Sequence, residues 1–323
     1  MATYPPRLRP LTVAEIVDAA FRLYRRHFGR FVAIAAVVYV PVGFVEAAVA
    51  AALLASAGRL ATSGQELPAN FIAGVGVPAV AIAVVAGIGY LLAYAAMAVA
   101  VSREYLGHEI SVAAAYSQVW PAVGALVGAW LLVTILVGMG FILCVIPGIY
   151  LAIALIFAVP VVVLEGLGAG AAIGRSMELV RGYWFHVFVT MLLLGLIVGI
   201  IQVGILWPVT FLITATLGTA FPVAANALTQ LISALASMVL FPLTMAGLVI
   251  IYYDLRVRKE GFDLQLLAEQ IGGKLGLPPS FPVETLPPPA APGTAGEPEP
   301  PPLPGEEAGR EGDAKWDDDE PRF

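Results

Sequence analysis

The chain has 323 residues, of which 59% are hydrophobic and only 12% are charged, whereas an ordinary soluble domain carries about 25% charged residues. This composition excludes a typical water-soluble globular protein, and the single cysteine, Cys144, excludes an internal disulfide and a metal cluster built from cysteines. Residues 1–275 hold 14 basic and 12 acidic side chains, a net charge of +2, whereas residues 276–323 hold 3 and 11, a net charge of −8. The sequence therefore predicts a mildly basic membrane region followed by a strongly acidic tail.

Six apolar stretches, arranged as three pairs, occupy most of the chain between Phe31 and Tyr252. A bilayer core about 30 Å thick is crossed by about 20 helical residues, and each stretch is close to or longer than this. We therefore predict an all-α, polytopic membrane bundle of six transmembrane helices, arranged as three hairpins. The predicted helices cover residues 31–57, 73–101, 122–145, 148–164, 185–213 and 226–252.

The connection between the third and fourth predicted helices is short and uncharged. An Ile146-Pro147-Gly148 turn has to reverse the chain there. A re-entrant hairpin that does not cross the membrane is the alternative, although an odd number of spans would place one basic cluster outside the cell. Six complete spans are therefore favoured, and the alternative stays open.

Basic residues lie on one side of the predicted bundle. They precede helix 1, lie between helices 2 and 3 and between helices 4 and 5, and follow helix 6, whereas the alternate connections hold only Arg59. By the positive-inside rule, this indicates a multi-pass protein of the cytoplasmic membrane with both termini in the cytoplasm. The predicted regions are a cytoplasmic N-terminus with an amphipathic helix (1–30), the six-helix domain (31–252), a cytoplasmic charged segment with a short helix (253–275) and a disordered, proline-rich acidic tail (276–323).

A short amphipathic segment precedes each pair of apolar stretches, at residues 12–31, 111–120 and 171–184. The first begins with Thr12 and Glu15 at capping-box spacing. We predict three cytoplasmic helices that lie in the headgroup plane with their apolar stripes on the bilayer. Basic side chains in these helices and after helix 6 are the predicted contacts to anionic lipid: Arg22, Arg25, Arg26, Arg175, Arg181, Arg256, Arg258 and Lys259.

Polar residues within the predicted spans are few. Glu46 is the only acidic one, and an intramembrane carboxylate costs about 2–3 kcal/mol at the bilayer centre. It is the best single candidate for a proton or cation relay; the alternative is a carboxyl group that reaches interfacial water or is protonated and hydrogen-bonded. Gln202 and Gln230 complete the candidate polar site, with interhelical hydrogen bonding as their alternative role. The sequence predicts no catalytic residue, no metal site and no cofactor.

Three segments carry a resemblance to a known family: Ile146-Pro147-Gly148-Ile149-Tyr150, the run 159–165 leading to 175–182, and the closing run 252–264, which contains Tyr-Tyr-Asp-Leu-Arg and Glu-Gly-Phe-Asp. Over about residues 10–275 the chain resembles the glycerophosphoryl diester phosphodiesterase membrane-domain family of bacterial six-helix proteins. The resemblance implies the membrane architecture but not the enzyme, because a (β/α)8 catalytic barrel needs about 250 residues and the chain after residue 252 is far shorter.

These observations predict a non-enzymatic membrane protein that scaffolds or modulates other membrane components. The alternative is a transporter of a lipid or small amphiphile with a cavity near Glu46. Membrane lipids are the predicted partners, and the proline-rich tail is where a protein partner would dock. No nucleic-acid partner is predicted.

Overall fold

The computed structural model describes residues 9–63, 74 and 76–261. Within these residues all regular structure is helical, and six stretches are long and apolar enough to cross a membrane. The predicted six-helix membrane bundle is therefore confirmed. The six stretches are Phe28–Ser56, Val77–Tyr105, Val112–Leu143, Val145–Leu164, Trp184–Leu217 and Pro222–Glu260.

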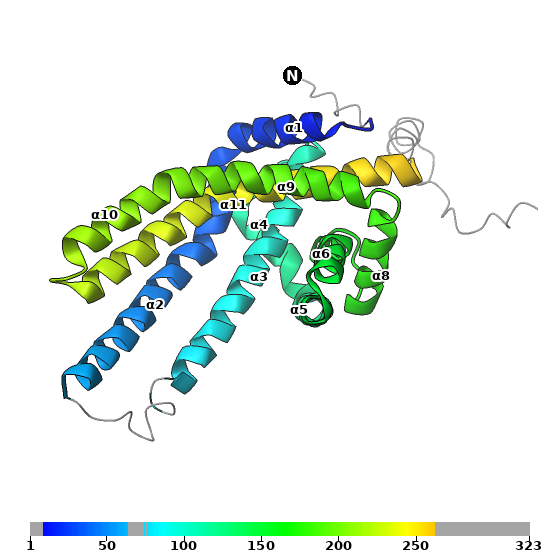
Figure 1. Cartoon of the computed structure of the whole chain (residues 1–323). Helices are drawn as coiled ribbons and strands as arrows, with labels where there is room; N and C mark the ends of the chain where they lie inside the picture. Colours follow the sequence, from blue (N-terminus) through cyan, green and yellow to red (C-terminus); the bar gives the residue numbers. More distant parts are fainter. Residues whose placement is uncertain (1–8, 64–73, 75, 262–323) are drawn as a thin grey trace, which may run out of the picture. The chain divides into compact units, whose positions relative to one another are not determined.

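The described chain forms three consecutive repeats, each a short helix followed by a helical hairpin (Figure 1). The first repeat contains α1 (Val13–Arg26), α2 (Phe28–Ser63) and α3 (Val77–Tyr105). The second contains α4 (Val112–Val119), the 3-10 turn η2 (Trp120–Ala122), α5 (Val123–Leu143), α6 (Val145–Ala154) and α7 (Ala158–Leu164). The third contains α8 (Ala169–Val180), α9 (Trp184–Ile201), the π-helical segment η3 (Gln202–Leu206), α10 (Trp207–Leu217) and α11 (Pro222–Glu260).

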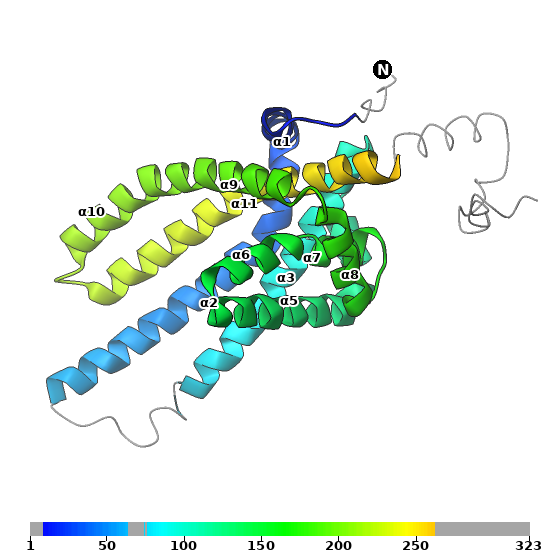
Figure 2. The same ribbon diagram turned by 45° about the vertical axis from the view of Figure 1, so that its right-hand side comes forward.

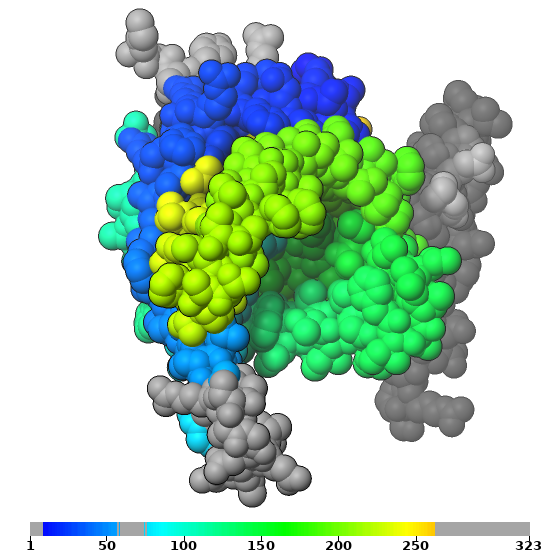
Figure 3. Space-filling model, turned by 60° about the vertical axis from the view of Figure 1, so that its left-hand side comes forward, coloured from blue at the N-terminus to red at the C-terminus, as the bar shows by residue number. Residues whose placement is uncertain are grey.

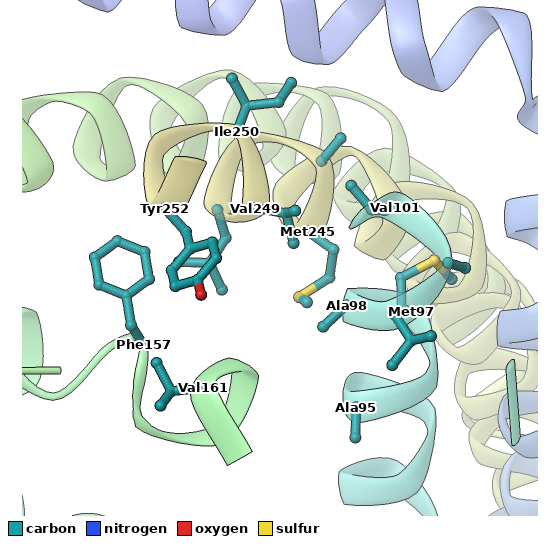
Figure 4. Close-up of a cluster of buried hydrophobic side chains, with 14 of the residues drawn as sticks. Ala95, Met97, Ala98, Val101, Phe157, Val161, Met245, Val249, Ile250 and Tyr252 are labelled. Atoms are coloured by element: carbon teal, nitrogen blue, oxygen red, sulfur yellow. The ribbon is translucent and has the colours of Figure 1, made fainter. Parts of the chain in front are cut away.

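The returning helices of the three hairpins meet in one core near their C-terminal ends. Met97 of α3, Phe157 just before α7 and Tyr252 of α11 are fully buried there (Figure 4). Alanines such as Ala95 and Ala98 give α3 a narrow face, which lets neighbouring backbones approach closely, as is typical where lipid supplies no hydrophobic drive for helices to associate. We call this end of the helices the base of the bundle.

Away from the base, the hairpins diverge. Figures 1 and 2 both show α9–α10 running beside α11, while the α2–α3 hairpin leaves in another direction. In Figure 3, which looks toward the hairpin tips, the surface is hollowed between the green-yellow α9–α10 segment and the teal-green α5–α6 hairpin. Side chains on these outer helices, such as Ile142, Phe185 and Phe211, are largely exposed, as expected for surfaces that face lipid.

Part of the apolar surface of α1 and of α4 packs on protein, whereas the prediction placed it on the bilayer. In α1, Ile16 and Ala20 are fully buried, and the hydroxyl of Tyr24 donates to the carbonyl of Val239 in α11 (2.8 Å). In α4, the hydroxyl of Tyr116 donates to the carbonyl of Ile34 (2.8 Å). Packing against the bundle satisfies these hydroxyls, which acyl chains cannot do. The predicted capping box of Thr12 with Glu15 is present at the start of α1.

The reversal between α5 and α6 does not use the predicted turn. Cys144 alone adopts an extended conformation (φ −174°, ψ 158°), and Pro147 lies in the first turn of α6. A proline is tolerated there because the first N–H groups of a helix have no intrahelical acceptor. The two helices approach closely because Gly148 faces the ring of Phe141 and Gly140 faces the backbone of Gly148.

Substitution of Gly148 by alanine is expected to destabilise this hairpin. The added methyl carbon would lie 2.5 Å from Cγ of Phe141, so the ring and the helix would have to shift, at a cost of about 1–3 kcal/mol. Gly138→Ala in α5 is the matched control, since its methyl meets nothing within 4 Å. Unfolding by SDS in mixed micelles measures both, and equal stability of the two variants would contradict the close approach.

The fourth predicted helix, residues 148–164, is interrupted. α6 ends at Ala154 and α7 begins at Ala158. The hydroxyl of the buried Ser176 bridges the gap, donating to the carbonyl of Ala154 (2.8 Å) and accepting from the N–H of Phe157 (3.2 Å). A helix from the third repeat thus satisfies backbone groups that the interruption leaves open.

The last helix is longer than predicted. α11 continues beyond Tyr252 to Glu260, so the predicted charged segment begins as helix. Two ion pairs at i,i+4 spacing, Asp254 with Arg258 and Arg256 with Glu260, support the extra turns. Gly261 ends the helix in the left-handed conformation (φ 61°), as is common at a helix C-terminus. The rest of the predicted segment 253–275, which was expected to contain a short helix, and the tail at 276–323 lie outside the described residues.

Candidate functional site

Two polar regions occur in the bundle: a set of ion pairs at the base and a pocket within the spans. At the base, the returning helix of each hairpin has an acidic residue at or near its C-terminal end that the sequence analysis did not single out. The exposed fractions of these side chains are 3% for Glu104, 15% for Glu165 and 0% for Asp254. Because a buried carboxylate needs partners, each one gathers groups from other helices.

Asp254 ties three parts of the chain together. Its Oδ1 accepts from the backbone N–H of Leu11 (2.6 Å), and its Oδ2 accepts from Nε of Arg258 (2.8 Å). Arg258 in turn donates to the carbonyl of Leu11 (2.6 Å). Nε2 of His186 lies 3.3 Å from Oδ2, close enough for an ion pair but without hydrogen-bond geometry. Asp254 therefore fixes the segment before α1 and the start of α9 on α11.

Glu104 holds the first repeat closed in a similar way. It accepts from Nη1 of Arg30 (2.8 Å), and Nδ1 of His27 lies 3.1 Å from its other oxygen. Burial lowers the pKa of His27, while the carboxylate of Glu104 acts in the opposite direction. His27 precedes the outgoing helix of the first hairpin, and His186 lies at the start of that of the third. The first and third repeats thus each place a histidine beside a carboxylate at the base.

Glu165, at the end of α7, pairs with arginine instead. Nε of Arg175 donates to it (2.9 Å), as does the hydroxyl of Tyr252 (2.7 Å). Arg175 also pairs with Glu260. Burial alone would lower the pKa of Arg175, but its hydrogen bonds with Glu165 and Glu260 raise it above its ordinary value. The second repeat is therefore joined to the third through one guanidinium.

The predicted lipid contacts fall into two groups. Arg175, Arg256 and Arg258 are only 19–23% exposed and pair with carboxylates of the protein, so their charges are already satisfied. The others are exposed, although two of them have protein partners as well: Arg22 pairs with Asp18, and Lys259 donates to the carbonyl of Glu178. A role in lipid contact stays a prediction for Arg22, Arg25, Arg26, Arg181 and Lys259.

Within the spans, a pocket of about 280 Å³ lies between α2, α3 and α11. It brings together Glu46 and Gln230, two of the three predicted polar residues. The hydroxyl of Tyr90 donates to Oε2 of Glu46 (3.1 Å). Glu46 lies 18 residues after the start of α2, about 27 Å along the helix. The complete lining is Tyr39, Glu46, Tyr90, Gln230, Ser233, Ala234 and Ser237.

Several polar side chains in this pocket form no hydrogen bond with the described protein. Among the described residues, none forms a hydrogen bond with the side chain of Gln230, Ser233 or Ser237. These residues recur at i, i+3 and i+7, so they share one face of α11. That spacing was the available sequence signal for the two serines, which the sequence analysis missed together with Tyr39 and Tyr90.

The third predicted residue, Gln202, is not part of this pocket. It begins the π-helical segment η3, which leads into α10 and Pro208. Segments of this kind mark places where the regular helix is interrupted. The structure therefore separates Gln202 from Glu46 and Gln230.

An apolar groove of about 320 Å³ lies beside the pocket helices α2 and α3. Gly89 of α3 fits against Val38 and Val42 of α2, where a methyl group on Gly89 would be 3.2 Å from Val38. The groove is lined by Pro41, Val42, Val45, Ala81, Ile82, Val85 and Ala86. All of these lining residues are apolar, so the groove is suited to a hydrocarbon chain.

The described residues contain no group of three or more histidine, cysteine or acidic side chains placed to hold a metal ion. No curated protein and no solved structure matches the chain. A family model described as a domain of unknown function (DUF7847) matches residues 10–255, which include the polar pocket and all three repeats except the last five residues of α11. The chain therefore belongs to the DUF7847 family.

Proposed function

We propose that this membrane protein binds the polar head of a lipid or small amphiphile between α2, α3 and α11, as a carrier or receptor without catalytic activity. The pocket around Glu46 carries the proposal. It places a carboxylate, an amide and the hydroxyl groups of two serines and two tyrosines inside apolar spans, and among these side chains only Glu46 and Tyr90 form a hydrogen bond, with each other. Polar groups in hydrocarbon are costly unless they are paired, so a bound head group or water accounts for their presence.

Native mass spectrometry of the protein in nanodiscs formed from its own membrane tests this proposal. We expect a retained small amphiphile that is lost from a Gln230→Leu, Ser237→Val double variant. Thr216→Val is the matched control, because Thr216 is exposed on α10 and its hydroxyl donates to its own helix. Retention of a stoichiometric protein, with no small molecule, would instead support a scaffold.

A scaffold or modulator at the lipid surface is the second candidate function. It is favoured by the exposed arginines of α1 and by the net charge of −8 in residues 276–323. We place the base and both termini on the cytoplasmic side of the cell membrane, since the basic residues gather there. We also propose that the resemblance to the glycerophosphoryl diester phosphodiesterase membrane domains reflects a shared membrane architecture.

Replacing Arg22, Arg25 and Arg26 together by glutamine is expected to weaken retention of anionic lipid. Each basic side chain near an anionic surface contributes about 1 kcal/mol, so the loss is about fivefold per residue. Native mass spectra of nanodiscs with phosphatidylglycerol and phosphatidylcholine measure it. Unchanged selectivity for the anionic lipid would remove α1 from the lipid-contact surface.

A further inference from the structure

We propose that the head group bound near Glu46 is an organic ammonium, and that the hydrocarbon chain of the same molecule lies in the groove between α2 and α3. This inference rests on the proposed function and specifies its ligand class. Glu46 is the only charged residue in the pocket lining, which contains no basic side chain among the described residues. A cation is the ligand that balances this carboxylate.

Among the described residues, Glu46 has one hydrogen-bond donor. The hydroxyl of Tyr90 donates to Oε2 (3.1 Å). An ionised group inside a span requires an opposite charge or further donors. Gln230 provides amide hydrogens, but neither it nor the two serines forms a hydrogen bond with Glu46 in the structure. An ammonium group would supply the missing charge.

Aromatic rings provide a second feature of ammonium sites. Tyr39 and Tyr90 both line the pocket, with ring centroids 5.0 Å apart in an edge-on arrangement. Phe241 packs against Tyr39 at 5.6 Å and holds that ring in place. Ring faces attract cations, and pairs of aromatic side chains recognise quaternary and substituted ammonium groups in proteins. A carboxylate beside two tyrosine rings therefore favours a cation over a neutral polyol or an anion.

The size of the pocket restricts it to the head group. Its volume of about 280 Å³ is below the range of about 300–1,000 Å³ that holds a whole drug-sized ligand. The groove provides the remaining space, and Val42 and Ala86 in its lining precede Glu46 and Tyr90 by one helical turn. A hydrocarbon chain in this groove places the ammonium next to Glu46.

Three amphiphiles with the same chain test the charge: dodecyltrimethylammonium, dodecyl maltoside and dodecyl sulfate, each radiolabelled and used below its micelle concentration with the protein in nanodiscs. We expect saturable binding of the cation, at least tenfold tighter than that of the other two. Glu46→Gln should weaken it at least tenfold, and Glu46→Asp, which keeps the charge, should retain the preference. Thr216→Val should bind like the unchanged protein.

The other outcomes separate the two proposals. Equal saturable binding of the maltoside would overturn the ammonium assignment and leave the proposed amphiphile site standing. Absence of saturable binding by all three would overturn both. If Glu46→Gln fails to fold, displacement of the bound cation by tetramethylammonium chloride, but not by sodium chloride, supports the ammonium site, and equal displacement by the two salts contradicts it. Cation binding that Glu46→Gln leaves unchanged would place the site elsewhere.

Discussion

Asp254→Ala is expected to lower the free energy of unfolding by about 3–5 kcal/mol, because removing one partner of a buried pair leaves the others without compensation. The carboxylate is fully buried and accepts hydrogen bonds from the backbone of Leu11 and from Arg258. Its loss would remove the anion that pairs with the guanidinium of Arg258 and lies beside the imidazole of His186. The segment before α1 would also lose its attachment to α11. Unfolding by SDS in mixed micelles measures the effect.

Two variants control for this result. Asp18→Ala removes an exposed carboxylate of α1 that pairs with Arg22 at i,i+4 spacing, and such surface pairs contribute little. Asp254→Asn keeps an oxygen for the N–H of Leu11 but removes the charge, so its stability should fall between those of Asp254→Ala and the unchanged protein. If Asp254→Ala were as stable as Asp18→Ala, the ion pairs at the base would not hold the repeats together.

The spans were predictable because their signal is local. About 20 consecutive apolar residues are sufficient to indicate a membrane helix, and the described residues contain six such stretches. The turn between the third and fourth spans was placed wrongly because proline and glycine favour both turns and the first turn of a helix. In the structure the chain reverses at Cys144, and Gly148 lies in α6, packed against Phe141.

The amphipathic pattern of the short helices was informative about their existence but not about what covers them. An apolar stripe with basic residues opposite is compatible with a bilayer surface and with a protein surface. The buried Ile16 and Ala20, and the hydroxyl of Tyr24 on the carbonyl of Val239, show that the bundle itself covers α1. The local sequence of α1 does not contain this information, because the surface that covers it belongs to α11, more than 200 positions later in the chain.

The candidate site was predictable only in part, for a similar reason. Glu46 is conspicuous in the sequence because it is a lone acid in a span, but Gln230 lies 184 positions later. Their proximity depends on how α2 crosses α11, where Gly43 lies so close to Ala234 that a methyl group would be 2.8 Å from its Cβ. Gln202 was grouped with them because it is a polar residue in a span. That criterion does not consider which neighbouring helices the residue faces.

Arg175→Met is expected to lower the free energy of unfolding by about 2–3 kcal/mol, less than Asp254→Ala because its partners reach some solvent. The guanidinium is bound by Glu165 and Glu260, whose side chains are 15% and 22% exposed. Methionine retains much of the apolar stem but removes the charge. Glu165 would then keep the hydrogen bond from the hydroxyl of Tyr252, while Glu260 would keep its ion pair with Arg256. Unfolding by SDS again measures the effect.

The double variant Arg175→Met, Glu165→Gln separates two causes of that loss. If the unpaired carboxylate is responsible, the neutral amide should recover stability relative to Arg175→Met alone, because the amide oxygen would still accept the hydroxyl of Tyr252. If the double variant is no more stable than the single one, the loss comes from packing around the guanidinium. Recovery would show that Glu165 holds the second repeat to the third by charge.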